Sequence, residues 1–422
     1  MDGTQSTIPT VDGTTTENGH IGNGAAVISY DITVNETITP NEIDKVLDSS
    51  SKTVTSNGTI VFYPKGNSVL ISVTGCDGII ENNKLIVANV TKNTECKLVA
   101  TKDITTLYNK ILTDKNTISE RTDFGTAYTT TNTRTLFKTT ENNIIVYYFA
   151  GNTTNNWVKF ANLYWRIIRT NHDGSIRLLY VGTSHDTTSG NIGESAFNTN
   201  SNSPKYVGYK YGEDTSLDTI RNNTTDSTIK TFIDSWYQNN LTNYTKYLST
   251  SAVYCNDRSE GTGQTYSASS KFNFASYYRM DWDTDGAKAN PSYNCTNIKD
   301  AFSVDNTSAK LDYPIALMTA DEIAYAGGVA FQKMSTPYAW FISNSTGSQV
   351  SSNWWSLSPI YWNGSYTLVW DWSSGLADLD FHTATDALGV RPAISLKFCI
   401  KYSTGNGTYN EPYEIKETSS GC

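Results

Sequence analysis

The sequence predicts an α+β protein in which a small all-β domain precedes a larger domain that combines a sheet with two helices. Apolar residues occupy every second position from 28 to 34, as on a half-buried strand. The letters TADE at 319–322 form a capping box that opens a helix, and Gly327 is placed to end it. The letters GVRPAISL at 389–396 are apolar and β-branched, as expected of a buried strand.

Composition narrows the class of protein. The 422 residues are enough for two or three domains. A net charge of −9 argues against a nucleic-acid partner, because phosphate binding needs a basic surface. Only 17% of residues are charged, whereas Tyr (27) and Trp (10) are abundant, which is typical of an exported, β-rich surface protein. No apolar run is long enough for a transmembrane segment, and we expect an extracellular protein whose signal peptide has been removed.

The N-terminal quarter is predicted to hold a leader and one small domain. Residues 1–24 are mostly Thr, Gly, Asn and Asp, so we expect a disordered leader. Residues 25–102 are predicted to form an immunoglobulin-like or stalk domain that acts as a spacer. An Asn-Gly turn at 57–58 joins two of its strands, and a capping box at 39–42 predicts a short helix. Further strands are expected at 68–74, 84–90 and 97–100.

A connecting segment, residues 103–142, follows. Leu107, Tyr108, Ile111 and Leu112 lie on one helical face, so a short helix is expected there. The rest of the segment is rich in Thr and Asn and is predicted to contain only short strands.

The large domain is predicted at residues 143–400. Its first strands are expected at 144–149 and 157–160, and a hairpin turns at Asp173-Gly174. Asp226 is expected to cap a helix whose apolar face recurs at helical spacing up to Trp236. Residues 401–422 are predicted to be a polar C-terminal tail with one edge strand near 412–415.

The six cysteines suggest disulfides. Pairing of nearest neighbours gives Cys76–Cys96, Cys255–Cys295 and Cys399–Cys422, although other connectivities and six free thiols are alternatives. No CxxC motif is present, so a zinc site is not expected.

The segment 354–396 combines a rigid frame with chemically mixed positions. Trp354, Trp355, Trp370 and Leu376 are expected to pack inward together with the run 389–396. The positions between these anchors are interpreted as following no helical or strand period, and they mix acidic, hydroxyl, apolar and aromatic types, which is typical of a recognition surface. The predicted ligand-binding residues are Tyr361, Tyr366, Thr367, Leu368, Asp371, Ser373, Ala377, Asp378, Asp380, His382, Thr383, Asp386 and Ala387.

Three motifs in this half of the chain resemble a known family. LMTADEIAYA at 317–326 resembles the LPTEAEWEYA helix of formylglycine-generating-enzyme-like domains, VWDW at 369–372 is similar to their VWEW, and GVRPA at 389–393 is similar to their GFRPA. The resemblance covers roughly residues 143–397 and implies a C-type-lectin-like fold, with a twisted antiparallel sheet, two helices and long loops.

Within that superfamily the chain looks most like the variable proteins of diversity-generating retroelements of bacterial surfaces and phage tails. The resemblance implies a segment rewritten at adenines, with Trp362, Trp370 and Trp372 in the fixed frame. An ordinary, fixed lectin-like loop is the alternative. The active-site cysteines of formylglycine-generating enzymes and the calcium motifs of sugar-binding lectins have no counterpart near this segment, so no enzyme activity is expected.

Two other sets of residues invite a chemical interpretation. Asp281, Asp283 and Asp285 have the spacing of a calcium loop, but position twelve is Ser292, so a solvated acidic turn is favoured over a calcium site. His20, His172 and His185 are expected to be exposed to solvent, and only His382 to contact a ligand. No other cofactor is expected.

The sequence therefore predicts an exported, cell-surface binding protein whose ligand is a macromolecule or a glycan. A structural pilus or stalk subunit is the alternative, and a formylglycine-type enzyme is a third. Oligomeric state and ligand identity do not follow from the residues.

Overall fold

The computed structural model has the α+β character that the sequence predicts, with strands far more numerous than helices. Among the described residues, every helix is too short or too polar to cross a membrane. The structure describes residues 6–9, 16–19, 29–36, 46–47, 52–54, 60–62, 68–81, 84–88, 94–102, 106–115, 117–280 and 289–422.

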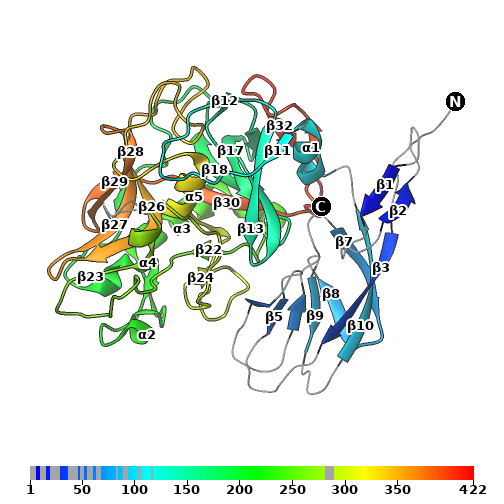
Figure 1. Ribbon diagram of the computed structural model, residues 1–422, viewed down its shortest axis with the longest axis horizontal. Helices are drawn as coiled ribbons and strands as arrows, with labels where there is room; N and C mark the ends of the chain where they lie inside the picture. The colour runs from blue at the N-terminus through cyan, green and yellow to red at the C-terminus, as the bar shows by residue number, and fades with distance from the viewer. Residues whose placement is uncertain are drawn as a thin grey trace.

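The N-terminal strands form three small sheets, drawn in blue in Figure 1. The first sheet pairs β1 (Ser6–Pro9) with β2 (Thr16–Gly19), inside the segment that the sequence predicts to lack structure. The second is β3 (Ser29–Glu36), β10 (Thr94–Lys102) and β7 (Ser68–Thr74). The third is β4 (Val46–Leu47), β5 (Lys52–Val54), β6 (Ile60–Phe62), β9 (Lys84–Val87) and β8 (Gly78–Glu81).

These sheets confirm the strands expected between residues 28 and 100. Strands β5 and β6 pair antiparallel on either side of the predicted Asn-Gly turn. The helix expected after the capping box at 39–42 lies outside the described residues, and the immunoglobulin-like assignment stays a prediction.

A ten-stranded sheet is the main element of the large domain (Figure 1). Its main path is β11 (Thr117–Ser119), β13 (Thr135–Glu141), β14 (Ile144–Tyr148), β17 (Leu163–Thr170), β16 (Trp157–Phe160), β32 (Tyr413–Ile415) and β31 (Tyr402–Thr404). Strand β18 (Ile176–Gly182) pairs with β17 and with β30 (Pro392–Leu396), which also pairs with β25 (Ile315–Leu317). The near-continuous apolar composition of β17 and β18 matches their burial on both faces.

The strand pairing of this sheet confirms one prediction and corrects another. The hairpin expected at Asp173-Gly174 joins β17 to β18, and Gly174 has the positive φ of 78° that the turn requires. The strand expected near 412–415 is present as β32, but it lies between β16 and β31 and is therefore not an edge strand.

The helices follow their sequence signals closely. Helix α1 (Leu107–Asp114) begins at the predicted position, with Thr106 as its N-cap. Helix α5 (Ala320–Ala326) has the predicted capping box between Thr319 and Glu322 and ends at Gly327, whose φ is 119°. The remaining helices are α2 (Leu217–Ile220), α3 (Thr228–Asn240), α4 (Ala275–Arg279) and the 3-10 turns η1 (Pro204–Val207) and η2 (Thr242–Tyr247).

One cap was predicted wrongly. The N-cap of α3 is Ser227, whose side chain accepts a hydrogen bond from the Lys230 amide, and not Asp226. Asp226 instead forms ion pairs with Lys210 and Lys230. A hydroxyl and a carboxylate are both good caps, so the sequence alone did not decide between neighbours.

A six-stranded sheet, drawn mainly in orange in Figure 1, contains the predicted recognition residues. Its main path is β19 (Glu194–Ala196), β29 (Ala387–Gly389), β26 (Trp354–Trp362), β27 (Thr367–Ser373) and β28 (Asp378–Thr383), and β23 (Phe272–Asn273) pairs with β26. Short pairs complete the fold: β12 (Thr131–Asn132) with β15 (Asn152–Thr153), β20 (Lys210–Tyr211) with β21 (Thr225–Asp226), and β22 (Tyr254–Cys255) with β24 (Ala301–Phe302). Residues of both large sheets, such as Trp165 and Trp370, belong to one buried core.

Candidate functional site

The candidate site lies on the antiparallel strands β27 and β28, which a turn at 374–377 connects. Tryptophans of β27 and of the neighbouring strand β26 fix this part of the sheet to the core: Trp362, Trp370 and Trp372 are at most 2% exposed. The indole of Trp370 also donates a hydrogen bond to the Ser276 hydroxyl on α4. The three tryptophans that the sequence assigned to the frame are therefore buried, as expected of a rigid support.

The thirteen predicted ligand-binding residues do not form one exposed patch, which corrects the prediction. Six of them are buried: Thr367, Leu368, Asp371, Ser373, Ala377 and Asp378. Seven are half-buried or exposed, and we call them the recognition surface: Tyr361, Tyr366, Asp380, His382, Thr383, Asp386 and Ala387.

Strand geometry explains the division. The run 367–373 is strand β27 and the run 378–383 is strand β28, so the absence of a strand period inferred from the sequence was wrong. Successive side chains of a strand point to opposite faces, and directly paired residues share a face. The register pairs Asp371 with Asp380 and Ser373 with Asp378, which places three carboxylates on one face of the hairpin.

Two residues of the connecting turn, Ala377 and Leu376, differ from their expected placement. Ala377 belongs to the turn: its φ is 57°, and its amide donates to the Ser373 carbonyl. Leu376 was expected to pack inward, but it is 54% exposed at the same turn. A hairpin turn places its central residues in solvent whatever their polarity, so this leucine does not contribute to the frame.

Asp371 and His382 form the best-defined polar contact of the site. The Nδ1 atom of His382 lies 2.8 Å from Oδ1 of Asp371. Burial raises the pKa of Asp371 to about 6 against the lowering effect of His382. The hydrogen bond with Asp371 in turn raises the pKa of His382, although partial burial opposes it. The pKa of each group therefore lies above its ordinary value.

Asp378 and Asp380 extend the acidic face. Burial, with the neighbouring charges of Asp380 and Asp371, raises the pKa of Asp378 to about 6. One carboxylate oxygen of Asp378 and one of Asp371 are buried without a hydrogen-bond partner among the described residues. Asp380 is half-buried, and its Oδ1 accepts a hydrogen bond from the Phe381 amide. Buried carboxylate oxygens without donors are costly, so this face favours a cationic or hydrogen-bonding ligand.

The opposite face of the same strands is aromatic. The rings of Tyr361 and Phe381 lie 5.3 Å apart, and Phe331 lies 5.9 Å from Phe381. Phe331 is 43% exposed, and the ammonium group of Lys271 lies 5.5 Å from the Tyr361 ring. Aromatic rings of this kind supply contact area with little loss of side-chain entropy on binding.

Sequence reasoning missed Phe331 and Phe381. The alternation of Leu379, Phe381 and Thr383 on β28 was a signal for Phe381, because it opposes the acidic set on the other face. Phe331 had no local signal: it reaches β28 through backbone hydrogen bonds of the segment 329–334, a contact between distant parts of the chain.

The structure does not test the possible calcium site considered in the sequence analysis. Asp281, Asp283 and Asp285 lie outside the described residues. Within the described part of the chain, the only three metal-ligating groups close enough to share an ion are Asp226, Asp234 and Asp312. The ammonium group of Lys230 already lies 2.5–3.1 Å from a carboxylate oxygen of each, and so takes the position of a cation.

The histidine predictions need one correction. His172 is buried, not exposed, and its Nδ1 lies 3.1 Å from a Glu141 oxygen. His185 is partly buried and shares a hydrogen bond with the Ser345 hydroxyl, whereas His20 lies outside the described residues. A turn position misled the prediction for His172, because the turn after β17 is itself covered.

The disulfides follow the nearest-neighbour pattern where they are described. Cys255 bonds to Cys295, and Cys399 bonds to Cys422. Cys76 is also in a disulfide, but the side chain of Cys96 is not described, so that pairing stays a prediction. No described cysteine is a free thiol.

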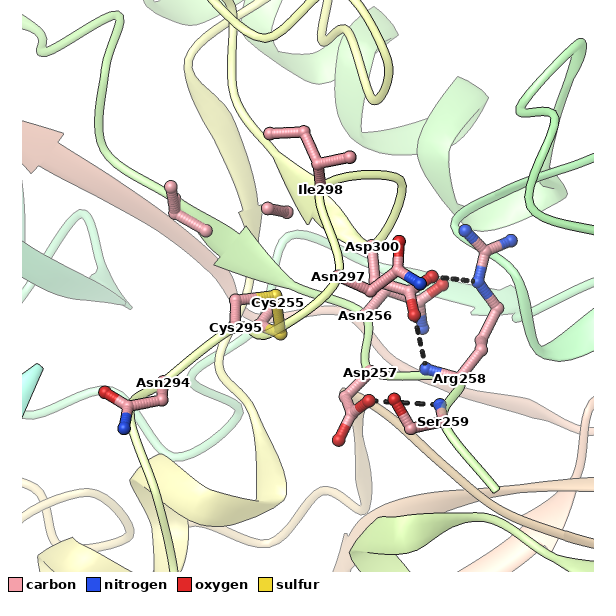
Figure 2. Close-up of a disulfide and its surroundings, with 12 residues drawn as sticks. Cys255, Asn256, Asp257, Arg258, Ser259, Asn294, Cys295, Asn297, Ile298 and Asp300 are labelled. Carbon is pink, nitrogen blue, oxygen red and sulfur yellow. Dashed lines mark hydrogen bonds and ion pairs between the residues drawn. A yellow bond between two sulfur atoms is a disulfide. The ribbon is translucent and has the colours of Figure 1, made fainter. Parts of the chain in front are cut away.

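Figure 2 shows the Cys255–Cys295 disulfide beside a buried charge network. Asp300 accepts a hydrogen bond of 2.7 Å from the Arg258 side chain (Figure 2). The Arg221 side chain donates another to Asp300, at 2.9 Å. The two chain segments that the disulfide joins are thus also tied by charge-assisted hydrogen bonds, which are stronger than neutral ones.

A second charge network lines a polar cavity near the same disulfide. Arg169 and Arg177 both donate to Glu322 on α5, and Arg279 donates to Asp257 and Asp321. Burial alone would raise the pKa of Glu322, but the two arginines outweigh it and lower the pKa. Three arginines therefore face three acids, and this cavity fits a structural role in fixing α5, α4 and the ten-stranded sheet.

Comparison of the chain with known protein families, with curated proteins and with solved structures finds no match.

Proposed function

We propose that this chain is an exported protein of a bacterial surface that binds a macromolecular or glycan ligand through the recognition surface. One observation carries the proposal: accessible Tyr, Asp, His and Thr side chains lie on β26, on β28 and on the adjoining turns of a sheet whose tryptophans, on β26 and β27, are buried. A rigid backbone reduces the entropy lost on binding and lets exposed side chains differ without unfolding the domain.

The same proposal assigns the large domain to the C-type-lectin-like fold and the chain to the variable proteins of diversity-generating retroelements. Its support is the order of the three motifs at 317–326, 369–372 and 389–393, and the burial of the tryptophans within them. The N-terminal sheets then serve as an immunoglobulin-like spacer. A reverse-transcriptase gene beside an imperfect repeat of codons 354–396 that differs at adenines would support this origin, and the absence of both would contradict it.

A binding array tests the function itself. The wild-type protein is applied to immobilised glycans and to bacterial and host surface proteins, beside a variant in which all seven residues of the recognition surface are replaced. His382→Gln is used in that variant so that a donor to Asp371 remains. A control variant carries seven substitutions at exposed positions of the C-terminal tail.

We expect the wild type and the control to bind the same ligand and the seven-residue variant to lose it. Equal binding by all three proteins would contradict the recognition surface. Binding by none of them, with all three folded, would favour the structural pilus or stalk subunit.

A further inference from the structure

The acidic row, which we define as Asp371, Asp378 and Asp380, differs from three buried carboxylates elsewhere in the described structure. Glu141, Glu322 and Asp300 each accept charge-assisted hydrogen bonds from arginine. Among the residues that the structure describes, no lysine or arginine forms an ion pair with any member of the acidic row. Within the same described residues, the single ion-pair contact of the row is the one between Asp371 and the imidazole of His382, which is charged only when protonated.

Two members of the row also have one carboxylate oxygen without a donor. Asp371 is fully buried and Asp378 is 5% exposed, yet Oδ2 of Asp371 and Oδ1 of Asp378 have no hydrogen-bond partner in the described structure. Strand register directs both side chains to the face that carries Asp380. A buried carboxylate with an unfilled oxygen is stabilised by any donor that reaches it, and most strongly by a charged one.

We propose that the acidic row binds the guanidinium group of an arginine side chain on a protein partner. This inference rests on the proposed function and names the chemistry of its ligand. Asp380, half-buried on strand β28, offers the accessible oxygen, and Asp378 the adjacent one. Asp371 is closed to solvent and held by His382, so the guanidinium reaches it only by displacing that imidazole.

The geometry favours guanidinium over a metal ion. Calcium bonds oxygens at about 2.3–2.6 Å, so its ligand atoms crowd within roughly 5 Å of one another. The acidic row does not bring three such atoms within 4.8 Å, unlike Asp226, Asp234 and Asp312 elsewhere in the described chain. A guanidinium presents five N–H donors in a plane and can bridge carboxylates at alternate positions of one strand, such as Asp378 and Asp380, whose Cα atoms lie about 7 Å apart.

The test is a titration of the full chain with the peptide acetyl-Gly-Arg-Gly-amide, followed by the NMR signals of the His382 ring. The matched peptide carries citrulline, which has the same shape without the charge. We expect the citrulline peptide to bind at least about tenfold more weakly than the arginine peptide. We also expect high salt to weaken binding of the arginine peptide to the wild type, because salt screens the attraction between charges.

Variants locate the site. Asp380→Asn and Asp378→Asn are each expected to weaken binding of the arginine peptide about tenfold or more, whereas Glu417→Gln, which changes the net charge equally at an exposed tail position, leaves binding unchanged. His382→Ala, whose binding is measured by isothermal titration calorimetry because it lacks the reporting ring, is expected to tighten binding by removing the competing imidazole. Melting curves identify any variant that fails to fold. If one Asp variant fails, binding is measured with the other.

Equal binding of the arginine and citrulline peptides, or equal weakening by Glu417→Gln and both Asp variants, would overturn the inference. Binding of a neutral oligosaccharide that these Asp variants abolish would assign the row to a glycan instead. The proposed function would survive either result if the seven-residue variant still loses its ligand on the array.

Discussion

The imidazole of His382 is one-third exposed and lies 2.8 Å from a carboxylate oxygen of Asp371, which is fully buried in the six-stranded sheet. This contact joins the accessible recognition surface to its buried support. It also determines how the stability of the site depends on pH.

The first prediction is that Asp371→Asn becomes progressively more stable than the wild type as the pH rises from 4 to 8. The folded pKa of Asp371 is about 6, above the usual value near 4, so the folded state holds its proton longer than the unfolded state. Asp371 therefore contributes to the free energy of unfolding at low pH. This contribution, about 3 kcal/mol, is lost as the pH rises from near the usual pKa through the folded pKa of about 6. The raised pKa of His382 adds a loss in the same direction above pH ~6.5.

Urea denaturation of both proteins at pH 4, 6 and 8 checks this prediction. A difference in unfolding free energy that stays constant across the three pH values would show that Asp371 is not held protonated by burial.

The second prediction separates frame from surface. Trp370→Ala removes a ring with no exposed area and should cost about 3–5 kcal/mol of unfolding free energy. Tyr366→Ala changes a side chain that is 56% exposed and should stay within about 0.5 kcal/mol of the wild type. Chemical denaturation measures both, and similar losses in the two variants would refute the division.

The third prediction concerns the disulfide between Cys255 and Cys295, which closes a sequence separation of 40 residues. Its removal by Cys255→Ala with Cys295→Ala should lower the unfolding free energy by about 2–4 kcal/mol. Mass spectrometry of an unreduced digest should first show the cross-linked peptide. Free thiols at both positions in protein produced under oxidising conditions would count against it.

The fourth prediction concerns Lys230. Lys230→Gln leaves the carboxylates of Asp226, Asp234 and Asp312 without their cation. We expect the free energy of unfolding to fall by about 3 kcal/mol. This value is at the lower end for a broken buried ion pair, because Asp312 is exposed. Millimolar calcium should restore part of that stability in the variant and leave the wild type unchanged. Melting curves with and without calcium test this, and an equal response of both proteins would exclude Lys230 as the cation of this cluster.

Local signals in the sequence were sufficient for much of the fold. The capping box of Thr319 and Glu322, the hairpin at Gly174 and the two described disulfides depend on residues close together or on simple spacing. The burial of Trp370 and Trp372 also followed from residue type, because large rings seldom remain in solvent within a sheet.

The candidate site was harder to predict because burial there runs against residue type. Asp371 and Asp378 are acidic yet buried, whereas Leu376 is apolar yet exposed. Only the register of β27 against β28 and contacts from distant segments, such as Phe331, decide these positions. Residue types therefore did not separate frame from surface in this segment, and the strand pairing decides which residues belong to each.

The melting curve of the variant with all seven recognition-surface residues replaced tests the central claim most directly. A matched variant carries replacements of the same kind at buried neighbours, Leu368, Ser373 and Ala377. We predict that the seven-residue variant unfolds cooperatively within a few degrees of the wild type, because exposed substitutions cost little. The buried-site variant should lose its cooperative transition. Loss of cooperative unfolding in the seven-residue variant would show that these positions belong to the core and would contradict the recognition surface.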